Sequence, residues 1–149
     1  MKMENQEIKK RYLATNFIGL IMIASVFGYC VVVEIIKRSF APFTGFINLS
    51  PQTAATIKYI LLCWSAGHYF LIKILQKRFN TPPNLNLPAG AVVSFVLAEA
   101  VALYGLIFFF IAGHAEDFYI FMAISLFFFY MFFPRFDRWE KLLAAATGK

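Results

Sequence analysis

The chain has 149 residues, of which 60% are apolar and only 15% are charged. Soluble domains usually hold about a quarter charged residues, and a chain this short cannot hide so much apolar surface in a core of its own. The net charge of +6 does not indicate nucleic-acid binding, because the basic residues stand in short clusters between apolar runs rather than alternating with aromatic residues. We therefore expect a membrane protein whose main partner is the lipid bilayer.

Four apolar segments are long enough, or nearly so, for a helix to cross the hydrocarbon layer, which takes about 20 residues. In chain order they cover residues 13–36, 54–75, 88–112 and 117–133. Lys37 and Arg38 follow the first segment, and Pro134 follows the fourth. Pro88 opens the third, where its missing N–H costs nothing. The sequence predicts an all-α fold, an integral membrane bundle of four transmembrane helices in one domain.

The basic residues indicate the orientation of this bundle. Those expected on one side are Lys2, Lys9, Lys10, Arg11, Lys73, Lys77, Arg78, Arg135, Arg138, Lys141 and Lys149. The opposite side holds Lys37, Arg38 and Lys58. Short loops rich in Lys and Arg stay in the cytoplasm. We therefore expect a multi-pass protein of the cell membrane with the basic tails 1–12 and 135–149 in the cytoplasm.

Two features near the C-terminus have less direct interpretations. Residues 138–146 fit either an amphipathic helix lying on the membrane or a solvated tail. The phenylalanines at 127–129 and 132–133 are expected to face lipid.

Glu99 breaks the apolar pattern more than any other residue. It lies about 16 Å into the third segment, at 1.5 Å per helical residue. An ionised carboxylate at that depth costs at least about 2.5–3.5 kcal/mol, so Glu99 needs a partner or a bound cation, or it stays protonated. An acid in such a position is a candidate functional residue.

Small residues recur every four positions on the same segment, at Gly90, Ser94, Ala98 and Ala102. Such a stripe lets another helix approach closely. Glu99 lies one residue, or about 100°, away from it. We expect the stripe to be a helix-packing face that also invites a further neighbour, in a homo-oligomer or from other membrane subunits.

The run Leu97–Ile107 (Leu-Ala-Glu-Ala-Val-Ala-Leu-Tyr-Gly-Leu-Ile) resembles the ion-carrying helix of the rotor-ring proteolipids of rotary ATP synthases, subunit c. In that family a carboxylate is followed by small residues and a Tyr-Gly pair. The resemblance implies that Glu99 is a reversible proton or sodium site, with Tyr104 as a further ion-binding candidate. Residues 78–82 loosely resemble the polar loop that precedes the helix in that family. The rest of the chain shows no such likeness.

His68 lies at nearly the same depth as Glu99, each within about 5 Å of the midplane. We therefore predict a Glu99–His68 hydrogen bond or ion pair as part of an ion-binding site. The alternative is that His68 bonds to a backbone carbonyl or to Ser65. Glu34 is explained by an i,i+4 ion pair with Arg38.

No catalytic motif, cofactor site or metal site is expected. His114, Glu116 and Asp117 stand close together, but solvated residues of a hairpin explain them better than a metal centre does. Two functions stay open. The protein handles protons or small cations through Glu99 as a proteolipid-like component of a membrane assembly, or it is a structural or assembly subunit in which Glu99 only holds helices together.

Overall fold

The structure, a computed structural model, describes residues 2–81 and 86–147, with side chains at 6–81 and 86–142. Within these residues the chain forms five helices, and the predicted all-α fold is confirmed. They are α1 (Lys2–Ser39), α2 (Pro51–Phe79), α3 (Leu87–Ala112), α4 (Ala115–Phe132) and α5 (Phe136–Thr147). The four apolar segments correspond to α1–α4, and α5 covers most of the C-terminal tail.

Three of these helices are long and apolar enough to cross a membrane, over Gln6–Ser39, Leu87–Ala112 and Ala115–Phe132. The remaining long helix, α2, has sufficient length but carries Lys58 and Lys73 within its apolar segment. These two charges lower its hydropathy relative to the other three helices. The protein is therefore a multi-pass helical membrane protein by length and composition.

Helix boundaries follow ordinary capping chemistry. Ser50 caps α2, where its hydroxyl accepts a hydrogen bond from the Thr53 N–H at 3.2 Å, and Pro51 occupies the first turn. Asn86 caps α3 in the same way by accepting from the Ala89 N–H at 3.2 Å. Gly113 ends α3 with a φ of 75°, and its N–H donates to the Phe109 carbonyl.

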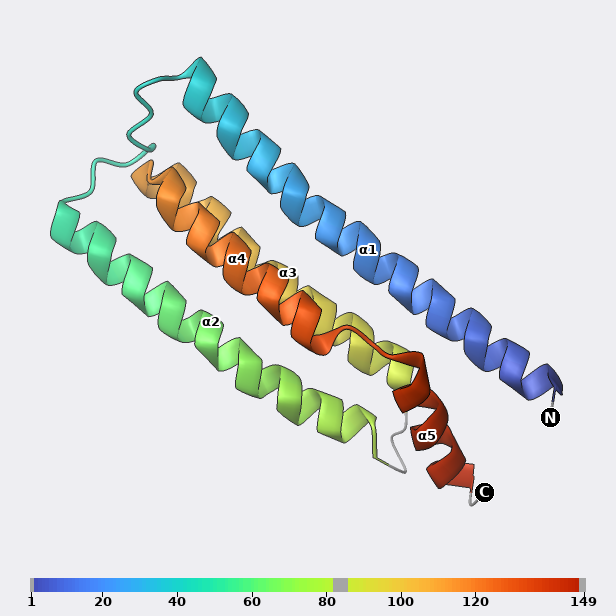
Figure 1. The fold of residues 1–149 in the computed structure, drawn as a ribbon. Helices are drawn as coiled ribbons and strands as arrows, with labels where there is room; N and C mark the ends of the chain where they lie inside the picture. Colours follow the sequence, from blue (N-terminus) through green and yellow to red (C-terminus); the bar gives the residue numbers. More distant parts are fainter. Residues whose placement is uncertain (1, 82–85, 148–149) are drawn as a thin grey trace.

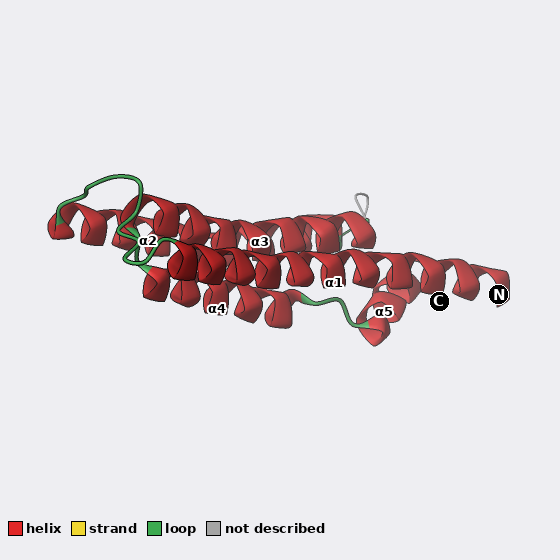
Figure 2. Ribbon diagram, turned by 90° about the horizontal axis from the view of Figure 1, so that it is seen from above, coloured by secondary structure: helices red, strands yellow, loops and turns green. Residues whose placement is uncertain are grey.

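The helices form an elongated bundle with α3 and α4 paired at its centre (Figures 1 and 2). α1 and α2 flank this pair on opposite sides in Figure 1, and α3 contacts all three of the other long helices. Both chain termini lie at one end of the bundle, next to α5, whereas the α1–α2 loop and the α3–α4 turn lie at the other (Figure 1).

Phenylalanines of α4 fill the centre of the bundle. Phe129 stacks on Phe95 of α3 with ring centroids 5.8 Å apart, and Phe128 and Phe132 both pack against Tyr69 of α2. The expectation that these rings face lipid is therefore wrong for Phe128, Phe129 and Phe132, which are buried, and it holds for Phe127, which is 54% exposed. α4 contacts α1, α2 and α3, so most of its rings have protein neighbours.

The outer faces of α1 and α2 carry large apolar side chains that no part of the described chain covers. The most exposed of them, each more than half exposed, are Leu13, Phe17, Leu20, Ile21, Phe27, Val31, Ile35, Tyr59, Ile60, Trp64, Phe70 and Ile74. Patches of this extent are not stable in water, so lipid contact is the natural state of these two faces.

The α1–α2 loop is fixed to the α3–α4 turn through the backbone. The N–H of Phe46 donates to the Phe110 carbonyl at 2.8 Å. Gly45 and Gly113 both have positive φ, of 87° and 75°, and approach each other closely. A Cβ atom on Gly113 would lie 2.5 Å from the Gly45 nitrogen and would also overlap the carbonyl carbon of Thr44.

Candidate functional site

Glu99 lies at the middle of α3 and faces α1. The hydroxyl of Tyr29 donates a hydrogen bond to Oε1 of Glu99 at 2.6 Å, and the hydroxyl of Ser25 lies against the same oxygen. Ser25 and Tyr29 are four residues apart, so they project from one face of α1. The Glu99 side chain is half-buried in the seam between the two helices.

Ser25 has a second neighbour that restricts how the hydrogen atoms can be arranged. Its Oγ lies 2.7 Å from the backbone carbonyl of Met22, which can only accept. A serine hydroxyl has one hydrogen to donate, so Met22 and Glu99 compete for it. Ser25 and Tyr29 thus both present hydroxyl groups to Oε1 of Glu99.

His68 belongs to α2 and contacts α3. Its Nδ1 is 2.9 Å from the Leu97 carbonyl, and its Nε2 is 3.2 Å from the Tyr104 hydroxyl. The indole N–H of Trp64 donates to the same hydroxyl at 3.3 Å. Because a carbonyl only accepts, Nδ1 carries the hydrogen of the contact with Leu97.

The predicted Glu99–His68 pair is therefore wrong. Glu99 bonds to Tyr29 of α1. His68 bonds to the backbone carbonyl of Leu97, as the alternative interpretation had it, and also to Tyr104. His68 reaches α3 from α2, whereas the Glu99 side chain leaves α3 on the side that faces α1. Of the three ion-binding candidates, His68 and Tyr104 lie together and Glu99 lies apart from them.

The stripe of small residues on α3 is covered by helices of the same chain. Gly90, Ser94, Ala98 and Ala102 are all buried. The Gln76 amide of α2 donates to the Ser94 hydroxyl at 3.1 Å. The stripe thus packs against helices of the same chain and, contrary to the prediction, it is not exposed to a further subunit.

Ser125 of α4 bonds at the same stripe, since its hydroxyl donates to the Ala98 carbonyl at 2.7 Å. Gly105 continues the close approach of α3 to α4, where a Cβ atom would lie 2.5 Å from Cβ of Phe121. The small residues therefore bring backbones near enough for a serine of one helix to reach the carbonyl of the next.

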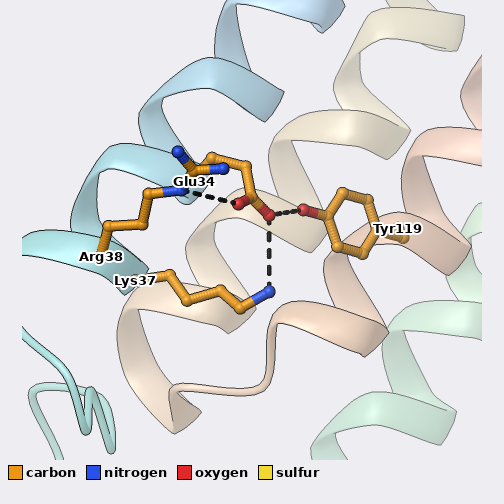
Figure 3. Close-up of polar contacts among 4 residues, drawn as sticks. All are labelled: Glu34, Lys37, Arg38 and Tyr119. Carbon is orange, nitrogen blue, oxygen red and sulfur yellow. Dashed lines mark hydrogen bonds and ion pairs between the residues drawn. The ribbon is translucent and has the colours of Figure 1, made fainter.

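A second polar cluster lies at the end of α1 nearest the α1–α2 loop (Figure 3). Glu34 forms ion pairs with Lys37 at 3.5 Å and with Arg38 at 3.7 Å, as the sequence spacing suggested for Arg38. The Tyr119 hydroxyl of α4 also donates to Glu34. This last contact, which ties α1 to α4, was not predicted.

Asp117 is buried at the start of α4 and is not a solvated hairpin residue as expected. Its carboxylate lies 3.2 Å from Nζ of Lys58 on α2 and 3.2 Å from Nδ1 of His114. The described part of the chain holds no group of three His, Cys, Asp or Glu side chains placed to bind a metal ion. The ion pair between Asp117 and Lys58 therefore joins α4 to α2.

No protein-family model, curated protein or solved structure matches this chain. The description of the protein as a multi-pass helical membrane protein therefore depends on its own residues and contacts. The resemblance of Leu97–Ile107 to subunit c stays a prediction.

Proposed function

We propose that the chain is a four-span protein of the cell membrane, with both termini in the cytoplasm, and that Glu99 reversibly binds a proton as part of a larger membrane assembly. The observation that carries this proposal is the position of Glu99, a half-buried carboxyl group at the middle of an apolar helix whose partners among the described side chains are the hydroxyl groups of Ser25 and Tyr29. An ionisable residue inside a membrane-spanning helix is a candidate functional residue.

Contacts along the whole of α2 support its inclusion as the fourth span. Near one end Lys58 pairs with Asp117 of α4, at mid-length His68 bonds to α3, and near the other end Gln76 bonds to α3. A helix that lies alongside two membrane-spanning helices over this length crosses the same layer. Four spans also account for both termini at one end of the bundle (Figure 1).

The contacts of Glu99 suit a proton site. The Tyr29 hydroxyl lies 2.6 Å from the carboxylate oxygen, in direct hydrogen-bond contact. The hydroxyl groups of Tyr29 and Ser25 therefore satisfy this oxygen without a bound cation.

Labelling with a hydrophobic carbodiimide tests this proposal, because the reagent reacts with protonated carboxyl groups in an apolar setting. We expect it to modify Glu99, and the modification to decrease as the pH is raised and the carboxyl group loses its proton. Sodium ions should give no protection. The measurement is peptide mass spectrometry of the labelled protein in vesicles across a pH series.

Glu34 of the same chain is the internal control, since it is paired with Lys37 and Arg38 and should stay unlabelled. Labelling of Glu99 that does not change with pH, or that sodium ions suppress, would contradict reversible proton binding.

A second candidate function is structural, and one observation favours it. Each of the other long helices has a polar contact with α3: α1 through Glu99, α2 through His68 and Gln76, and α4 through Ser125. In lipid such contacts hold helices together. In this candidate the protein is an assembly subunit, and Glu99 fixes α1 to α3 without exchanging its proton.

Substitutions at Glu99 separate the two candidates. Glu99→Gln keeps a polar group for Ser25 and Tyr29 but cannot release a proton, whereas Glu99→Leu removes both bonds. We expect Glu99→Leu to destabilise the protein by about 1–2 kcal/mol in detergent and Glu99→Gln to be close to wild type. Proton uptake by purified protein, measured with a pH-sensitive dye, should be lost in both. Uptake that Glu99→Gln retains would favour the structural candidate.

A further inference from the structure

A cavity of about 550 Å³ lies at the end of the bundle that holds the chain termini. It is lined by the end of α2, the start of α3, the exit of α4 and the first turns of α5. Gln76, Gly90 and Trp139 of α5 are among the lining residues. Trp139 is itself fixed by an edge contact with Tyr12, with ring centroids 5.5 Å apart.

The lining of this cavity is basic. Arg135, Arg138 and Lys141 contribute three positive side chains, and Asp137 contributes one carboxylate. None of the three basic groups forms an ion pair with a side chain at 6–81 or 86–142. The cavity therefore has an excess of positive charge that the described side chains leave without a partner.

An apolar groove of about 440 Å³ continues from the same place along α4. It shares Phe133, Pro134 and Arg135 with the basic cavity and extends past Phe129 to Ile23 of α1. Almost all of its surface is apolar, and it leads from the end of the bundle toward its middle. Arg135 stands where the basic cavity and the apolar groove meet.

We propose that these two adjoining hollows bind one anionic phospholipid. The headgroup phosphate lies among Arg135, Arg138 and Lys141, and an acyl chain lies in the groove between α1 and α4. A basic pocket at a membrane surface recognises phosphate oxygens through Lys and Arg. The groove accounts for the rest of the ligand, because a free phosphate ion has no apolar part to fill it. This site is separate from Glu99 and does not depend on its proposed proton exchange.

The two tryptophans of the chain provide a direct test. Trp64→Phe leaves Trp139, which lines the cavity, as the sole tryptophan. The protein is placed in phosphatidylcholine vesicles that contain the same small fraction of either brominated phosphatidylglycerol or brominated phosphatidylcholine, each brominated near the headgroup. We expect the anionic lipid to quench Trp139 at several-fold lower content than the zwitterionic lipid.

Substitutions then identify the basic groups. Replacing Arg135, Arg138 and Lys141 with Gln should remove the preference, whereas Arg135→Lys with Arg138→Lys should largely retain it. The control is Lys9→Gln with Lys10→Gln, two basic residues at the same end of the bundle that do not line the cavity. Equal quenching by both lipids, a preference that survives the triple substitution, or displacement of the anionic lipid by millimolar inorganic phosphate would each overturn the proposal.

Discussion

Gly113→Ala is expected to destabilise the protein by about 2–5 kcal/mol. Two causes add together at this position. The φ of 75° is strained for a residue with a side chain, and the new methyl group would meet the backbone of Gly45 and Thr44. Backbone atoms cannot move aside as the end of a flexible side chain can, so the α1–α2 loop would separate from the α3–α4 turn.

Thermal unfolding in detergent, followed by circular dichroism, measures the effect, and limited proteolysis within residues 40–50 reports release of the loop. Gly67→Ala is the matched control, because a Cβ atom there meets nothing within 4 Å. It should leave stability unchanged or raise it by up to about 1 kcal/mol. Equal behaviour of the two variants would show that the loop and the turn are not held together as described.

Lys58→Met is expected to cost about 3 kcal/mol, because it leaves the carboxylate of Asp117 buried with His114 as its remaining partner. Removing one member of a buried pair is costly mainly because the other charge stays behind. The double variant Lys58→Met with Asp117→Leu removes both charges and should recover most of the lost stability.

Equilibrium unfolding of the two single variants and the double variant gives the coupling energy. Lys73→Met is the control on the same helix. Lys73 is exposed and lies 4.6 Å above the ring of Tyr69, with no carboxylate paired to it among the described side chains. A double variant as unstable as Lys58→Met alone would contradict the pairing of α2 with α4 through Asp117.

The helices of this protein could be predicted from its sequence because apolar length, proline and glycine positions and capping residues are local signals. The fold class and the approximate bounds of α1–α4 follow from them. The exposed or buried state of the α4 phenylalanines does not, because it depends on which helices surround α4. Phe127 and Phe128 are adjacent in sequence, yet one is exposed and the other is buried between helices.

The candidate site could be predicted only in part, because a local pattern identifies an unusual residue but not its partners on other helices. Glu99 stood out because an acid in an apolar helix is rare, but depth alone did not identify its partners. Ser25 and Tyr29 were missed, although their spacing of four residues on one face of an apolar helix was a usable signal. Lys58 and Asp117 are far apart in sequence, and no local pattern pairs them.

The order of α1 and α3 along the chain has a consequence for biosynthesis. α1 emerges from the ribosome first, so Ser25 and Tyr29 are already within the bilayer when the segment with Glu99 arrives. Insertion of a polar side chain into hydrocarbon without a partner costs free energy, and hydroxyl groups already on α1 lower that cost. The first helix thereby supplies hydrogen-bond partners for the third helix as it inserts.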